Sequence, residues 1–182
     1  MIPELGHFLL WLALGVSLVL GTLPLVGASR GDQAWMAIAR PATYILMGLV
    51  TVAYLCLVAA FVMNDFSVIN VARNSNTALP LAYRIAASWG SHEGSLLLWI
   101  LMLVFWSGAV ARFSRGMPMP MLSRTLSVMG LISVGFLMFL LLTSNPFDRQ
   151  FDVPADGRDL NPLLQDPGMV FHPPLLYMGY VG

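Results

Sequence analysis

Four long apolar segments are the feature that most constrains how this chain can fold. Each segment has no Asp, Glu, Lys or Arg in its interior, and each is flanked by polar or charged residues. A helix needs about 20 apolar residues to cross the hydrocarbon core of a bilayer. We therefore predict an all-α fold, a polytopic bundle of transmembrane helices. The expected spans are residues 6–26, 41–63, 95–111 and 121–143.

The composition is typical of a membrane protein. Charged residues make up 10% of the 182 residues, whereas soluble domains carry about 25%. Nine arginines balance nine acidic residues, so no net charge attracts nucleic acid or an acidic partner. The single cysteine, Cys56, excludes an internal disulfide. No basic region precedes the first segment, so we expect it to be a mature span and not a signal peptide.

The distribution of arginines predicts the orientation in the membrane. Two connections between segments are rich in arginine, one with Arg30 and Arg40, the other with Arg112, Arg115 and Arg124. By contrast, residues 145–172 contain five Asp and two Arg. The positive-inside rule places the arginine-rich connections in the cytoplasm. The N-terminus, residues 64–94 and the stretch from residue 145 are then expected on the outer, periplasmic side.

A fifth apolar run starts near Pro173 and continues to Gly182. Proline is favoured in the first turn of a helix, so this run resembles the start of a fifth span. His172 precedes a proline, which favours an extended backbone. We therefore expect its side chain at the mouth of a membrane helix, on the outer side. A neutral imidazole there could ligate a metal or heme iron, and the alternative is a histidine that simply lies at the interface.

The loop before the third segment holds further candidates. Leu81, Ile85 and Trp89 recur every four residues, which predicts a short helix at the membrane interface. His92 and Glu93 follow at the entrance to the third span. They could cap the free backbone N–H groups of that helix, or they could contact a ligand held at the outer face. The chain has no HExxH, cysteine pair or Gly-rich phosphate loop, which argues against a hydrolase or an ATPase.

Two long motifs resemble a known family. The first runs from Asn74-Ser-Asn-Thr-Ala-Leu-Pro80 to Trp89-Gly-Ser-His-Glu-Gly-Ser-Leu-Leu-Leu-Trp99. The second is Leu160-Asn-Pro-Leu-Leu-Gln-Asp-Pro-Gly168, followed by Phe171-His-Pro-Pro-Leu-Leu-Tyr-Met-Gly-Tyr-Val-Gly182. In these motifs and over its whole length the chain resembles the CcmF family, the heme-lyase subunits of bacterial cytochrome c maturation. The paralogous NrfE proteins, which serve a formate-dependent nitrite reductase, look almost the same.

The resemblance implies a heme-handling protein of the bacterial inner membrane. Such proteins bind heme b at the periplasmic face and attach it to apocytochrome c. The chaperone CcmE delivers the heme, and CcmH with CcmI presents the apocytochrome. His172 lies in the second motif, and the resemblance implies that it is an axial ligand to the heme iron. Further candidate contacts to the heme are His92, Glu93, Trp89, Arg84 and Arg158.

The family pattern extends beyond this chain. Members of the family carry a Trp-rich segment and a second outer-face histidine that would lie after Gly182. We therefore expect residues 1–182 to be an N-terminal fragment that does not attach heme by itself, and its catalytic residues stay unknown. Two other classes remain open: a small-molecule transporter, and a non-catalytic scaffold that recruits maturation partners. Against a transporter, no span carries an interior ionisable residue.

Overall fold

The structure is a computed structural model that describes residues 1–114 and 116–182. Arg115, one of the arginines used for the orientation, lies outside the described residues. Within them the chain is helical and has no strand, which confirms the predicted all-α class. The helices are α1 (Ile2–Arg30), α2 (Gln33–Ala37), α3 (Ala39–Val62), α4 (Ile69–Asn74), α5 (Leu81–Ala87), α6 (His92–Phe113), α7 (Met119–Thr143), the 3₁₀ helix η1 (Pro162–Gln165) and α8 (Pro167–Val181).

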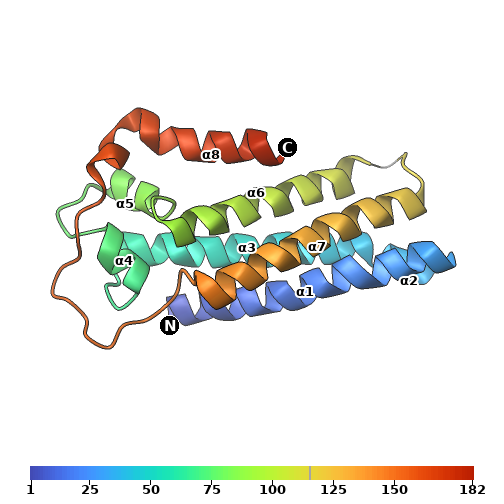
Figure 1. Cartoon of the computed structure of the whole chain (residues 1–182), viewed down its shortest axis with the longest axis horizontal. Helices are drawn as coiled ribbons and strands as arrows, with labels where there is room; N and C mark the ends of the chain where they lie inside the picture. The colour runs from blue at the N-terminus through green and yellow to red at the C-terminus, as the bar shows by residue number, and fades with distance from the viewer. Residues whose placement is uncertain (115) are drawn as a thin grey trace.

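The four long helices form an up-and-down bundle (Figure 1). α1 packs against α3 and α7, and α6 packs against the same two helices. These four contain 22 to 29 residues each, which is enough to cross a bilayer core of about 30 Å. All four are also apolar enough to do so. The protein is therefore a multi-pass membrane protein.

Two glycines allow α1 and α7 to approach closely. A Cβ atom at Gly130 would lie 3.1 Å from the backbone nitrogen of Gly21 and 2.9 Å from Cγ of Leu20. A Cβ atom at Gly21 would lie 2.8 Å from Leu131. Small residues at a membrane helix interface let the backbones meet, and dispersion contacts then hold the pair together. The α1–α7 contact thus depends on the absence of a side chain at both positions.

The connections segregate between the two ends of the bundle. The chain's N-terminus, α4, α5 and the start of α8 lie at one end, and α2 and the α6–α7 connection lie at the other (Figure 1). This is the grouping that the arginine distribution predicts. We call the first of these the outer end, after the side on which the arginine distribution predicts it. At the opposite end, Arg40 donates to the Ser114 carbonyl at 3.2 Å, and Arg124 donates to the Ala28 carbonyl at 3.4 Å. These arginines therefore also satisfy carbonyls at helix C-termini.

Helix α8 begins earlier than expected, at Pro167 rather than near Pro173. Asp166 explains the earlier start, because its side chain accepts a hydrogen bond from the Gly168 amide at 2.8 Å. An Asp cap followed by a proline is a strong helix start. His172 consequently lies inside the helix, and the expectation that it has an extended backbone is wrong. The preference of a residue before proline is outweighed here by a helix that has already begun upstream.

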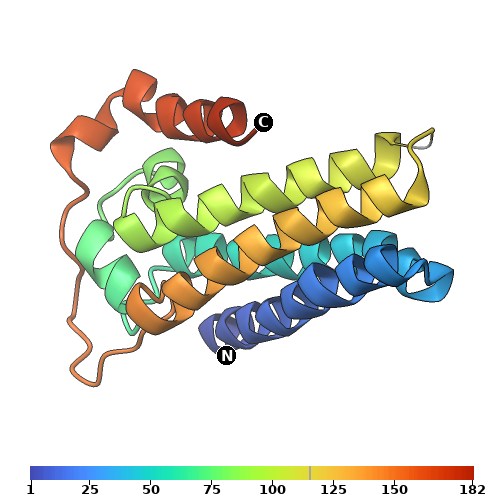
Figure 2. The ribbon, with the colours of Figure 1, turned by 45° about the vertical axis from the view of Figure 1, so that its right-hand side comes forward.

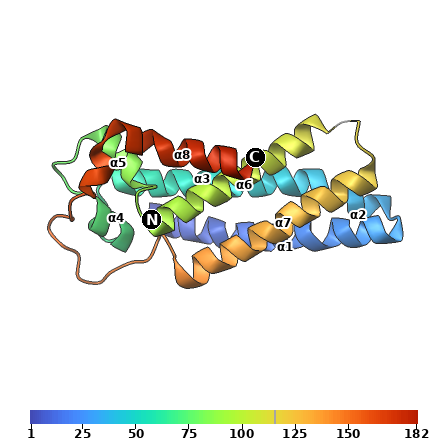
Figure 3. The same ribbon diagram turned by 45° about the horizontal axis from the view of Figure 1, so that its top comes forward.

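Helix α8 runs back along α6 and away from the outer end (Figures 2 and 3). It packs against α6 and η1. Because it lies beside the bundle, α8 forms one wall of a groove whose other walls are α6 and α7.

Candidate functional site

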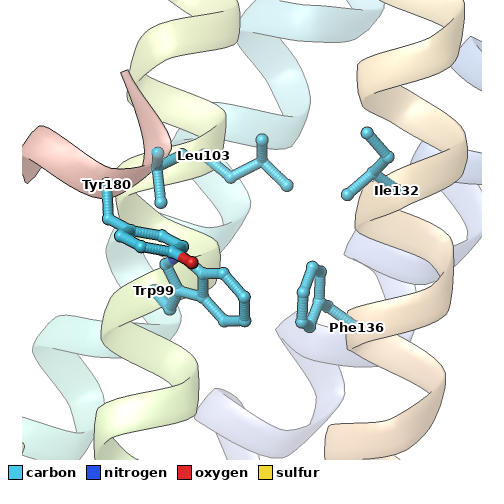
Figure 4. A pocket seen from close by; sticks show the side chains of 6 residues that line it. Trp99, Leu103, Ile132, Phe136 and Tyr180 are labelled. Carbon is cyan, nitrogen blue, oxygen red and sulfur yellow. The ribbon is translucent and has the colours of Figure 1, made fainter. Parts of the chain in front are cut away.

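An apolar groove lies between α6, α7 and α8 (Figure 4). Its first cavity, of about 160 Å³, includes Trp99 and Phe136, whose rings meet edge to face with centroids 4.4 Å apart. A second cavity of about 430 Å³ shares Ile132 and Phe136 with the first and continues along α7. The groove can therefore accept a flat or extended apolar group. Its lining residues are Leu96, Trp99, Leu103, Ile132, Gly135, Phe136, Phe139, Tyr180 and Val181.

His92 lies at the outer mouth of this groove. It lines a small cavity of about 100 Å³ together with Trp99 and Tyr177. Its ring also meets that of Phe139 edge to face, with centroids 6.3 Å apart. The imidazole is exposed. His92 thus joins the polar outer surface to the apolar groove, which is a suitable position for a ligand contact.

Glu93 faces a different cavity from its neighbour His92. This polar cavity of about 250 Å³ also contains Asn70, Arg73 and Asp148. The cap of α6 is Ser91, whose hydroxyl accepts a hydrogen bond from the Gly94 amide at 3.0 Å. The expectation that His92 and Glu93 cap this helix is therefore wrong. Glu93 still lies in the first turn of α6, where a negative charge favours the helix dipole.

His172 is exposed on α8 near the outer end. Its imidazole has no hydrogen bond or ion pair with any residue that the structure describes. Both ring nitrogens are therefore available, and a neutral imidazole is a common ligand for heme iron.

Trp89 contacts the backbone of α8 rather than facing solvent. Its indole N–H donates a hydrogen bond to the Val170 carbonyl at 3.1 Å, and its half-buried ring packs against the core. The structure thus joins two predicted site residues: Trp89 is bonded to the turn of α8 that carries His172.

Arg84 has a structural role in the outer loops. Its guanidinium donates to the Leu79 carbonyl and to the Thr77 carbonyl, each at 2.7 Å. These bonds hold residues 77–79 in place. Asp156 completes the contact from the other side, because it accepts hydrogen bonds from the Thr77 hydroxyl at 2.8 Å and the Thr77 amide at 3.0 Å. We call this contact the Thr77 clasp.

Arg158, like Arg73, is an outer-end arginine whose side chain is exposed and has no partner among the described residues. Its backbone amide donates to the Ala72 carbonyl at 2.7 Å. Arg149 differs from it, because it pairs with Glu4 across the bundle end.

Acid should open the Thr77 clasp. Hydrogen bonds from the Thr77 side chain and amide hold the pKa of Asp156 below its ordinary value. A carboxyl with a lowered folded pKa stabilises the fold fully above its unfolded pKa of about 3.9. That stabilisation is lost as the pH falls through the lower folded value. We expect hydrogen exchange in residues 150–160 to accelerate below about pH 4, relative to intrinsic rates.

A pair of variants tests the assignment to Asp156. Asp156→Asn should exchange faster already at pH 6 and show no further acid-dependent step. Asp152→Asn is the matched control, since Asp152 is exposed, and it should keep the parent profile. An unchanged acid step in Asp156→Asn would assign the transition to another group.

The aromatic groove is the part of the site that sequence reasoning missed. Trp99, Phe136 and Tyr180 lie on three helices that are distant in the sequence, and each residue alone reads as ordinary membrane-facing surface. The available signal was the concentration of aromatic side chains in the third and fourth spans and the fifth run. That signal could not show which of them face one another.

Comparison with known proteins supports the predicted family. The chain is 58% identical to the cytochrome c-type biogenesis protein CcmF of Escherichia coli and 59% identical to that of Pseudomonas aeruginosa. It is 45% identical to the cytochrome c-type biogenesis protein NrfE of Haemophilus influenzae. Each alignment covers 100% of this chain and 28 to 29% of the relative. The chain thus spans less than a third of the length of these relatives.

A solved structure and a family profile agree with these relatives. The structure, titled cytochrome c heme lyase CcmF, matches 100% of this chain and 28% of its own, with a TM-score of 0.86 and 29% identity. The predicted resemblance to CcmF, with NrfE as a close relative, is confirmed. The profile of the cytochrome C assembly protein family matches residues 89–182, which contain the Trp89 turn, the groove helices and α8. This chain belongs to the cytochrome C assembly protein family.

Proposed function

We propose that this chain acts in cytochrome c-type biogenesis as the part of a heme lyase that receives heme at the outer face. The observation that carries the proposal is His172, an exposed imidazole without a hydrogen-bond partner in the described chain, on the helix whose C-terminal residues Tyr180 and Val181 line an aromatic groove. The names of the relatives, biogenesis proteins and a heme lyase, support the same function.

The residues at the outer end include the chemical groups that a heme requires. His172 offers a ring nitrogen as an axial ligand to the iron. Arg158 offers a guanidinium without a partner among the described residues, which suits a propionate carboxylate. The groove below His92 offers apolar walls. When heme is bound, its vinyl groups supply the carbons that become joined to the cysteine thiols of the apocytochrome. The protein holds and orients the macrocycle, so that positioning supplies much of the rate.

The remaining parts of the proposal rest on the family resemblance. The bound group would be heme b, delivered by CcmE. Apocytochrome c would be presented by CcmH and CcmI at the periplasmic face of the bacterial inner membrane. Attachment of heme would require the rest of a longer protein, because the relatives are more than three times the length of this chain.

Substitution of His172 tests the function. In the complete membrane protein, His172→Gly should reduce co-purified heme and the yield of holocytochrome c about ten-fold or more, a typical cost of disrupting a metal-ligand site. Added imidazole should restore part of the heme binding, because it can enter the vacated position and ligate the iron. Pyridine hemochrome absorbance measures the heme.

His7→Gly is the matched control for this experiment. His7 also lies at the outer end, but it is hydrogen-bonded to Trp11 at 2.9 Å and contacts Asn145 at 3.1 Å. We expect its substitution to leave heme content within about two-fold of the parent, because bonds to protein already occupy the ring. Heme content that is unchanged in His172→Gly would rule out the ligand role.

A further inference from the structure

Helix α8 contains an internal gap in its hydrogen bonding. In an α-helix, each carbonyl accepts a hydrogen bond from the amide four residues later. For Val170 that residue is Pro174, which has no N–H to donate. The proline therefore leaves the Val170 carbonyl without its intrahelical donor, one turn into a helix that lies at the edge of the bundle.

The indole of Trp89 fills this gap. Its Nε1 donates to the Val170 carbonyl at 3.1 Å, although the two residues are 81 positions apart in the sequence. A carbonyl that is withdrawn from water on folding and gains no donor carries a free-energy cost. The Trp89 bond offsets that cost, and it also attaches α8 to the turn between α5 and α6.

The turn that carries Trp89 is itself firmly held. The amides of Trp89 and Gly90 donate to the Ala86 and Ala87 carbonyls at 3.1 and 3.0 Å. A Cβ atom at Gly90 would lie 2.9 Å from Leu164, so this turn also packs closely against η1, just before α8. Trp89 is therefore a fixed point from which the orientation of α8 can be set.

The held carbonyl is close to the proposed heme ligand. Val170 is half-buried and His172 is exposed. Residues two positions apart in a helix differ by about 200° in direction, so they face nearly opposite sides. The Trp89 bond holds the inner side of the turn, and the imidazole is left facing outward.

We propose that Trp89 is a positioning residue for His172: its indole replaces the hydrogen bond that Pro174 removes, and so fixes the direction of the imidazole toward the heme iron. The proposal rests on the proposed function, in which His172 is an axial ligand. Partners that orient a ligating histidine typically change metal affinity by about 10- to 100-fold when they are removed.

A second tryptophan that is bonded to α8 provides a matched control. Trp106 donates its indole N–H to the Met178 carbonyl at 3.1 Å. That carbonyl also accepts from the Gly182 amide at 3.3 Å, so no gap exists there. The two bonds have the same chemistry and the same length. Only the one from Trp89 replaces a missing helix bond next to His172.

The test uses the complete protein, purified in detergent, with four variants. Trp89→Phe keeps an aromatic ring and removes the N–H. Trp106→Phe does the same at the control position. Pro174→Ala adds a backbone N–H that can donate to the Val170 carbonyl. The double variant, Trp89→Phe with Pro174→Ala, loses the indole donor and gains this backbone donor in its place. The measurements are heme retention under competition from apomyoglobin, the Soret spectrum and the heme reduction potential.

We expect Trp89→Phe to retain heme about ten-fold less well, with an altered Soret band and potential. Trp106→Phe should stay within about two-fold of the parent, because its carbonyl keeps an intrahelical donor. The double variant should return to the level of Pro174→Ala alone. Recovery of heme retention in the double variant would show that the hydrogen bond to Val170 matters, and not the indole ring as such, because the indole is still missing there. If Trp89→Phe folds poorly, the comparison of Pro174→Ala with the double variant still decides, since the proposal requires these two to be equal.

Two results would overturn the proposal. One is a Trp89→Phe protein with parental heme retention and spectrum, and the other is a double variant that retains heme less well than Pro174→Ala alone. Parallel measurement of His172→Gly separates this failure from that of the proposed function. Loss of heme in His172→Gly without loss in Trp89→Phe contradicts only the role of Trp89. Parental heme retention in His172→Gly contradicts the ligand role of His172 itself.

Discussion

Replacement of Gly94 by alanine should prevent most of the protein from reaching its folded state. A Cβ atom at this position would lie 1.8 Å from the carbonyl oxygen of Ser88 and 2.9 Å from its carbonyl carbon. These are backbone atoms at the end of α5, so they cannot rotate away as a side chain could. The Gly94 amide is also bonded to the Ser91 hydroxyl, which caps α6. We expect a loss of about 3 kcal/mol or more, at the upper end of overpacking costs.

Gly48→Ala is the matched control for this substitution. Gly48 lies in α3, and a Cβ atom there would meet nothing within 4 Å. The measurement is the monodisperse fraction after size exclusion in detergent, together with unfolding by increasing mole fraction of SDS. The Gly94→Ala protein should give a much smaller folded fraction, and Gly48→Ala should be as stable as the parent or slightly more stable. Equal behaviour of the two variants would mean that α5 and α6 do not approach as closely as described.

Alanine substitutions at Gly130 and Gly135 should have opposite effects on stability. Both glycines lie in α7, five residues apart. Alanine is favoured over glycine within a helix by about 0.5–1 kcal/mol. At Gly135 a Cβ atom meets nothing within 4 Å, so that gain should be retained. At Gly130 it would approach the Gly21 backbone at 3.1 Å, and the cost of separating α1 from α7 should exceed the gain.

We expect Gly130→Ala to destabilise the bundle by about 1–3 kcal/mol. Unfolding in SDS, followed by far-UV circular dichroism, measures both variants on one scale. Gly135→Ala should unfold at the parental SDS fraction or above it. If Gly130→Ala is as stable as Gly135→Ala, close backbone contact does not hold the α1–α7 interface.

Local sequence patterns were sufficient for the four long helices and for their order along the chain. A stretch such as residues 41–63 excludes charge over a length that suits a spanning helix, because each backbone N–H and C=O in lipid must be bonded within the segment. The short helix predicted for residues 80–89 is present as α5, since its apolar side chains recur at a helical spacing. The placement of the connections at two ends also follows from where the arginines lie.

Local patterns did not predict the correct first residue of a helix where several neighbouring residues could each have capped it. His92 and Glu93 were plausible caps for α6, but Ser91 has the short hydroxyl and the extended backbone that a cap requires. At α8, Asp166 begins the helix before Pro173 is reached. His172 is therefore helical, although the residue before a proline usually is not. In both cases one nearby side chain outweighed a statistical preference.

The amino-acid sequence was therefore enough to predict the all-helical class, the four spans and the family. These follow from hydropathy and from motifs, which act over neighbouring residues. The packing of the helices was needed to show that His92 and Glu93 face separate cavities, that Trp99 and Phe136 line one groove, and that Trp89 bonds to α8. Such pairings join positions as far as 81 residues apart. The physical reason is that a hydrogen bond or a ring contact needs two groups within a few ångströms, and the packing of the helices sets that distance.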